Sequence, residues 1–225
     1  MKIAKSPKGK AMWAKVVMPD TKFDPDGVYE INLVMDEDDP ECKEWCADLE
    51  AMIEERVEQE LEENASRFKK MPDERPLTAL PVKEVEDQDG NETGELSFKF
   101  KLKAVGKNRK GETYTRRPLV VDAKGSPIVK LDSDGKVLNG DFKIGNGSLV
   151  RCHYVPLPYY MASTKTVGVS LQIKAVQVIK LVEFGGSGYD FDEEDGYEHK
   201  GEEESRPKAA AKGASEEDGD ENWDF

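Results

Sequence analysis

The segment from Leu96 to Ala104 alternates between apolar and polar side chains along its whole length. Successive side chains of a β-strand point to opposite faces, so this period of two predicts a strand with one buried and one exposed face. The buried face would carry Leu96, Phe98, Phe100 and Leu102, and the exposed face Ser97, Lys99, Lys101 and Lys103. A chain with such a strand has to build a sheet or barrel that covers the aromatic side.

Further segments of the chain are rich in strand-forming residues. They cover residues 12–18, 28–35, 118–122, 149–155 and 167–184. Turn-forming residues separate the strands, at Asp89-Gly90, Asn108 to Gly111, Lys124-Gly125, Asp134-Gly135 and Gly145-Asn146-Gly147. Several short strands with little helix predict a mostly β protein, a small barrel or a sandwich.

One long helix is predicted from Pro40 to about Lys70. Asp39 is a good N-cap residue, and proline is favoured at the first helical position. Apolar residues then recur at helical spacing and form one stripe, which comprises Cys42, Trp45, Cys46, Leu49, Ile53, Val57, Leu61 and Phe68. The other faces are acidic, because residues 36–63 contain 14 acidic and 2 basic side chains. For the two cysteines, buried thiols are favoured over metal ligands because no histidine pair accompanies them.

The chain changes composition after residue 184. Residues 185–225 contain 15 acidic and 4 basic side chains and almost no aliphatic ones. Such a segment cannot bury enough apolar surface to offset the entropy of ordering it. We therefore expect one folded domain over residues 1–184, followed by a disordered acidic C-terminal tail over residues 185–225.

The net charge of −14 hides a basic body. Once the acidic helix segment and the tail are set aside, residues 1–35 and 64–184 hold 18 acidic and 27 basic side chains. Charge read by segment therefore permits a nucleic-acid ligand. The chain has only three cysteines, and no apolar run has the length of a membrane span. We expect a soluble protein of a reducing compartment, without a membrane partner.

A cluster of basic residues follows the lysine face of the strand at residues 96–104. It comprises Lys107, Arg109, Lys110, Arg116 and Arg117. Together with Lys99, Lys101 and Lys103, these side chains are predicted to form a groove that follows the phosphates of a nucleic acid. The alternative is a solvated strand face or a sheet edge protected by lysine.

The segment from Arg151 to Tyr160 combines aromatic with cationic side chains around a predicted proline-interrupted loop, Val155-Pro156-Leu157-Pro158. Flat rings beside cations suit unpaired bases, which stack on aromatic side chains with little sequence preference. The residues expected to contact DNA here are Arg151, Tyr154, Tyr159 and Tyr160. Core packing of Tyr154 is an equal alternative, and Trp13 and Trp45 are expected in the core or in an interface.

The sequence contains no recognisable catalytic or metal-binding pattern. Asp-x-Asp-Gly stretches begin at Asp87 and Asp132, but the first ligand position of a calcium loop would fall on Val85 or Lys130, so both are predicted to be turns. No enzymatic activity, metal or other cofactor is therefore expected. A nuclease whose carboxylates converge from distant positions around a metal ion is a distant alternative.

Several short motifs occur in an order that resembles one family. They are Gly27-Val28-Tyr29, the Asp-Pro start of the acidic helix with its nearby cysteine, Phe98-Lys99-Phe100-Lys101, Leu119-Val120-Val121-Asp122, Val155-Pro156 with aromatics after it, Val167-Gly168, Leu171-Gln172, Phe184-Gly185-Gly186 and the terminal Asp224-Phe225. Together they resemble the replication single-stranded-DNA-binding proteins of short-tailed, podovirus-type phages, over nearly the whole chain.

This resemblance implies an OB-fold barrel and a homodimer. It implies that the protein binds and protects single-stranded DNA in replication, recombination and repair, promotes annealing, and acts in the cytoplasm of the infected bacterium. It also implies that the tail binds the phage DNA polymerase and primase-helicase through Trp223, Asp224 and Phe225. The helix is a departure, since it follows two evident strands where a simple OB fold places its helix later. An acidic adaptor or DNA mimic without DNA-binding activity is the alternative function.

Overall fold

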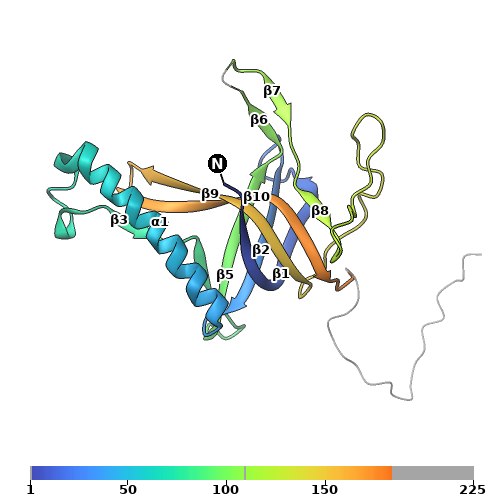
Figure 1. Ribbon diagram of the computed structural model, residues 1–225, viewed down its shortest axis with the longest axis horizontal. Coiled ribbons are helices and arrows are strands. Elements are labelled where there is room, and N and C mark those ends of the chain that lie inside the picture. Colours follow the sequence, from blue (N-terminus) through green and yellow to red (C-terminus); the bar gives the residue numbers. More distant parts are fainter. Residues whose placement is uncertain (1, 109, 184–225) are drawn as a thin grey trace, which may run out of the picture. The chain divides into compact units, whose positions relative to one another are not determined.

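The computed structural model describes residues 2–108 and 110–183. Arg109 and the predicted tail, including Trp223, Asp224 and Phe225, lie outside the described residues. The strands are β1 (Ala4–Asp20), β2 (Val28–Asp36), β3 (Leu77–Ala79), β4 (Val82–Glu86), β5 (Glu92–Lys103), β6 (Val105–Lys107), β7 (Thr113–Thr115), β8 (Leu119–Val121), β9 (Leu149–Met161) and β10 (Thr166–Lys180). The helical elements are α1 (Pro40–Asn64) and short 3-10 turns at Ala65–Arg67 and Pro72–Glu74 (Figure 1).

Five of the strands close into a barrel. Antiparallel pairs join β10 to β9, β9 to β1, β1 to β2 and β2 to β5. Parallel pairing of β5 with β10, with Phe100 opposite Leu171 and Lys101 opposite Gln172, completes the circle. Strand β4 adds to β5, and β3 and β8 add to β10. The predicted mostly β, OB-fold-like barrel is thus confirmed.

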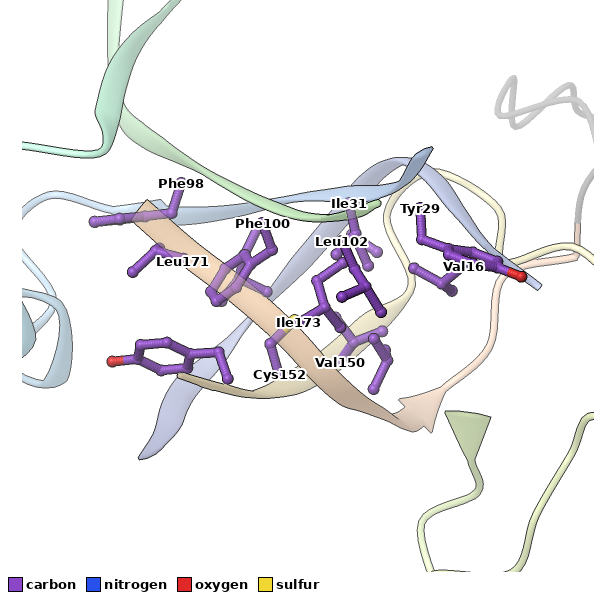
Figure 2. Close-up of a cluster of buried hydrophobic side chains, with 14 of the residues drawn as sticks. Val16, Tyr29, Ile31, Phe98, Phe100, Leu102, Val150, Cys152, Leu171 and Ile173 are labelled. Atoms are coloured by element: carbon purple, nitrogen blue, oxygen red, sulfur yellow. The ribbon is translucent and has the colours of Figure 1, made fainter. Parts of the chain in front are cut away.

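The apolar face of β5 fills the barrel interior. Phe98 and Phe100 are fully buried while Lys99 and Lys101 stay exposed, so the period of two predicted for this segment is confirmed. Figure 2 shows how side chains from the other barrel strands meet this face, among them Ile173 of β10. Full burial of a large apolar side chain contributes about 1.5–3 kcal/mol to folding, so this cluster fixes which face of β5 points outward.

Helix α1 begins where predicted and ends before the predicted boundary near Lys70. The Asp39 carboxylate accepts a hydrogen bond from the Glu41 N–H at 2.7 Å. The helix ends at Asn64, whose backbone leaves the helical region and whose side-chain amide donates to Glu60. Asparagine side chains compete for hydrogen bonds within helices, which favours an end at this residue. Among the described residues, no helix combines the length and the apolar character needed to cross a bilayer.

The buried stripe of α1 packs against the barrel through Trp45. Its ring centroid lies 4.3 Å from that of Phe98, and its Nε1 donates to the Tyr154 hydroxyl at 2.7 Å. Trp45 is therefore a core residue, one of the two locations that its sequence predicted. Cys42 on the same stripe is also buried, and this burial raises the pKa of its thiol to about 12. Helix α1 is inserted between β2 and β5, after two barrel strands, as the order of segments indicated.

Strand β9 continues through the segment that was predicted to be a loop. It pairs with β10 from Leu149 to Met161, with Pro156 and Pro158 inside the paired region. The loop prediction was wrong because proline removes the hydrogen-bond donor from only one edge of a strand. On its other edge β9 pairs with β1 only as far as Tyr154, so in the described structure both prolines face an edge that has no ladder partner.

Candidate nucleic-acid interface

A groove of about 830 Å³ lies on the outside of the barrel, over the seam where β5 pairs with β10. The described residues that line it include five cationic side chains and one acidic side chain. The cations are Lys83, Lys99, Lys101, Lys103 and Arg116, and the acid is Asp24. Leu80, Val82 and Leu157 add apolar surface. The groove therefore combines positive charge with apolar surface, which together suit phosphates and unpaired bases.

Two of the three β5 lysines are ion-paired in this structure. The Lys99 Nζ lies 3.1 Å from a carboxylate oxygen of Glu30, and the Lys103 Nζ lies 3.8 Å from one of Asp24. Lys101 has no carboxylate within ion-pairing distance in the described part of the chain. Exposed ion pairs contribute only about 0–1 kcal/mol, so a phosphate can replace either carboxylate at small cost.

Tyr159 provides an aromatic side chain at the wall of the groove opposite to the lysines. It is 37% exposed and lies on β9 beside Gly168 of β10. A Cβ atom added to Gly168 would come within 2.7 Å of the Tyr159 hydroxyl oxygen, so the ring rests directly over this glycine. The glycine thus holds one side of the ring against the sheet and leaves the rest of its surface to the groove. The structure brings together the lysine face and one of the three predicted tyrosines.

The other two predicted tyrosines do not reach the groove. Tyr154 is only 2% exposed, and its ring packs against Trp45 and Phe100 in the core. Tyr160 packs edge to face on Phe68, with ring centroids 5.8 Å apart. For Tyr154 the structure therefore shows the core-packing alternative, and Tyr160 does not line this groove. Because successive side chains of a strand point to opposite faces, only one of Tyr159 and Tyr160 can face the groove once β9 is a strand.

Arg151 lies on a different part of the barrel surface. It stands opposite Lys8 in the β1–β9 pair, and His153 stands opposite Lys5 in the same pair. Residues opposite one another in antiparallel strands share a face, so the cations Lys5, Lys8 and Arg151 and the imidazole of His153 form a surface separate from the groove. Partial burial lowers the pKa of His153, and the charges of Lys5 and Arg151 lower it further. A contact between Arg151 and DNA stays a prediction.

The remaining predicted cations divide between the groove and its surroundings. Arg116 lines the groove and donates from Nε to a backbone carbonyl of β5 at 2.8 Å. Arg117 instead donates to the Gly135 carbonyl at 2.9 Å and lines another cleft. Lys107 and Lys110 belong to the β6–β7 hairpin, which extends away from the barrel in Figure 1.

Two residues of this surface were missed by sequence reasoning. Lys83 lies on β4, directly after the proline-rich connector, and lines the groove. Phe23 lies in the turn between β1 and β2, is 87% exposed, and lines a neighbouring cleft together with Lys99 and Lys101. A large aromatic residue within a turn of Asp, Pro and Gly residues was the available signal for Phe23. For Lys83 there was none, because a lone lysine after a connector is ordinary.

The geometry of the barrel and its groove defines a class of protein. A closed β-barrel with an outer groove that combines cations, apolar surface and an exposed aromatic ring is the arrangement of OB-fold proteins that bind single-stranded nucleic acids. The profile of the family described as Single-stranded DNA-binding protein, Bacteriophage T7, matches residues 9–181 of this chain. The chain therefore belongs to the family of T7-type phage single-stranded DNA-binding proteins.

Individual relatives agree with this assignment. The chain is 27% identical over 206 residues to the single-stranded DNA-binding protein of Escherichia phage T7, covering 89% of this chain and 79% of the relative. It is 29% identical over 173 residues to that of Enterobacteria phage T3, covering 74% and 67%. The crystal structure of gp2.5, a single-stranded DNA-binding protein encoded by bacteriophage T7, superposes with a TM-score of 0.61 at 28% identity, covering 88% of this chain and 98% of that chain. Members of this family are binding proteins rather than enzymes.

Proposed function

We propose that the protein binds single-stranded DNA without sequence specificity along the groove between the β5 lysines and Tyr159, during phage DNA replication. The observation that carries the proposal is the meeting of Lys99, Lys101 and Lys103 with Tyr159 across one continuous hollow. The lysines bind phosphates and release the counterions of the strand. The tyrosine ring stacks on a base, and every base offers a π-face for this contact.

A titration with oligo(dT), followed by fluorescence anisotropy over a series of salt concentrations, tests the proposal. Replacing Lys99, Lys101 and Lys103 by glutamine should weaken binding and lower the slope of log affinity against log salt by about 0.7 for each phosphate that the variant no longer neutralises. The matched control replaces three exposed lysines outside the groove lining, Lys43, Lys70 and Lys124, by glutamine, and should change neither quantity to the same degree. Equal effects of both sets would contradict a specific role of the groove.

The acidic segment 185–225 completes the proposed function, although it lies outside the described residues. With 15 acidic and 4 basic side chains, it complements the lysine-lined groove. We propose that it competes with DNA for the groove and, once displaced, recruits the phage DNA polymerase and primase-helicase through Trp223, Asp224 and Phe225. Annealing of complementary strands, roles in recombination and repair, homodimer formation and action in the cytoplasm of the infected cell belong to the same proposal.

Truncation after Ser187 tests the part played by the tail. The truncated protein should bind oligo(dT) more tightly than the full chain at low salt, and it should no longer bind the polymerase. Unchanged or weaker DNA affinity after truncation would rule out competition. The same titration distinguishes the proposed function from that of an acidic adaptor or DNA mimic. Such a protein would not bind oligo(dT), so the anisotropy would not change.

A further inference from the structure

Trp13 occupies a backbone conformation that bulky residues avoid. In the β1–β2 pair Met12 stands opposite Asn32 and Lys15 stands opposite Glu30, so Trp13 and Ala14 together oppose a single residue. This is a β-bulge, and its first residue, Trp13, has a φ of 54°. Glycine is the usual residue at a left-handed bulge position, because a Cβ atom is disfavoured there. Bulges of this kind re-aim a side chain, and strained residues concentrate at functional sites.

The backbone around Trp13 is held firmly on its other edge. The Trp13 N–H donates to the side-chain oxygen of Asn146 at 2.9 Å, and the Ala11 carbonyl accepts from the Gly147 N–H at 2.9 Å. Despite this anchoring, the Trp13 side chain is 66% exposed, so the core location considered from the sequence was wrong. Burial of the indole therefore does not explain the strained backbone of Trp13. The hydrogen bonds hold that backbone in place, so the exposed ring is attached to a rigid part of the barrel surface.

The indole borders a second hollow, of about 390 Å³. Its apolar lining includes Val16, Met18, Phe142 and Ile144. The charged residues among the described lining are Lys143 and Lys15, and Lys15 is ion-paired with Asp20, which lies outside that lining. The main groove likewise combines an exposed aromatic ring, apolar surface and positive charge.

The two hollows each share lining residues with a third. Lys15 lines both the Trp13 hollow and a cleft that contains Phe23, and that cleft shares Lys99 and Lys101 with the main groove. The cleft is also lined by three carboxylates, each of them ion-paired with a lysine: Asp20 with Lys15, Glu30 with Lys99 and Asp24 with Lys103. The strand pairing explains this arrangement, since Lys101 stands opposite Glu30 and Glu30 stands opposite Lys15 across β5, β2 and β1. Three hollows with shared lining residues therefore follow one another over the outer face of the barrel, from Tyr159, past Phe23, to Trp13.

We infer that Trp13 is a second base-stacking residue, and that single-stranded DNA leaving the main groove crosses β2 and β1 to reach it. The inference rests on the proposed function of the main groove. Unpaired bases are the occupant that these features favour, because the hollow continues the proposed DNA path, its lining carries lysines, and its rim presents a rigid aromatic ring. The predicted consequence is that long oligonucleotides contact Trp13 and short ones do not.

Tryptophan fluorescence of a Trp223→Phe variant tests this inference. Besides Trp13, that variant retains only Trp45, which is buried and bonded to Tyr154 and should be insensitive to DNA and to iodide. Titration with an oligo(dT) of about 16 nucleotides should quench Trp13 and shield it from iodide, whereas about 4 nucleotides should bind without this change. The two lengths span the range of site sizes known for single OB folds.

Two substitutions of Trp13 separate an effect on base stacking from an effect on the stability of the fold. Trp13→Gly relaxes the bulge, so it should not lower the melting temperature, but it should weaken binding of the long oligonucleotide by about tenfold and of the short one far less. Trp13→Phe should retain most of the affinity for the long oligonucleotide. The inference is overturned if the long oligonucleotide binds without changing Trp13 emission, or if truncation after Ser187 alone changes that emission as DNA would. Absence of binding of the short oligonucleotide to the unsubstituted protein would instead contradict the proposed function of the main groove.

Discussion

The ring of Tyr159 on β9 rests over Gly168 on β10, where a Cβ atom would lie within 2.7 Å of the phenol oxygen. This contact orients the aromatic surface that we assign to base stacking. We expect Tyr159→Ala to lower the affinity for oligo(dT) by about tenfold, since stacking of one base contributes roughly 1–3 kcal/mol. The salt slope should stay unchanged because no phosphate contact is removed. Anisotropy titrations at several salt concentrations measure both quantities.

The adjacent residue gives a matched control. Tyr160 packs on Phe68 on the opposite face of β9, so Tyr160→Ala should reduce stability by removing that packing, with little effect on DNA affinity under conditions where the variant is folded. Urea unfolding together with the same titration separates the two effects. Equal decreases of DNA affinity from both substitutions would mean that the strand alternation does not decide which tyrosine binds DNA.

Gly168→Ala should act on DNA binding through Tyr159. The added methyl group would collide with the ring and would also lie 3.1 Å from the Ala79 carbonyl oxygen, so the ring must move. We expect weaker oligo(dT) binding in the single variant. In a Tyr159→Ala background the same glycine substitution should cost little additional affinity, because the two residues are in contact and their effects are not additive. Additive decreases of affinity would contradict this coupling.

Removal of the Lys99–Glu30 ion pair should raise the affinity for DNA. Glu30→Gln should free Lys99 for a phosphate and raise the affinity for oligo(dT) at low salt, by up to about fivefold for an exposed ion pair. Glu58→Gln on the exposed surface of α1 makes the same change in net charge outside the groove lining. If both variants gain equally, net charge and not the Lys99 pair controls the affinity.

His153 predicts a pH dependence of stability. Burial, with Lys5 and Arg151 nearby, lowers its pKa in the folded state, so the unfolded chain binds the proton more readily. Stability is therefore retained above the unfolded pKa, near 6.5, and decreases as the pH falls through that value. Urea unfolding at about pH 5 and about pH 8 should show a smaller difference in His153→Gln than in the unsubstituted protein. An equal difference in both proteins would exclude His153 as a source of the pH dependence.

Local sequence patterns predicted the elements that have a clear apolar and polar alternation or a clear helix N-cap. The alternation at Leu96 to Lys103 predicted β5, and Asp39 with Pro40 predicted the start of α1. The first part of β1, from Ala4 to Lys10, gave no such signal because lysine, proline and glycine interrupt it. Its strand conformation depends on pairing with β9, which is distant in the sequence.

The candidate site was only partly predicted, again because some of its residues reach the groove through pairing between separate strands. Lys99, Lys101 and Lys103 follow directly from the alternation, but Lys83 enters the groove only because β4 pairs with β5. Treating residues 155–160 as a loop left Tyr159 and Tyr160 equivalent, whereas strand geometry places them on opposite faces. The exposed position of Trp13 depends on a bulge that no local pattern indicated.

Photo-crosslinking of an iodouracil-substituted oligonucleotide, with the attached peptide identified by mass spectrometry, tests most directly where the strand lies. We predict crosslinks to Tyr159 for short oligonucleotides, and to Tyr159, Phe23 and Trp13 for long ones. Crosslinks concentrated at Tyr160, or on the surface formed by Lys5, Lys8, Arg151 and His153, would contradict the assignment of the groove over β5 and β10 as the DNA-binding site.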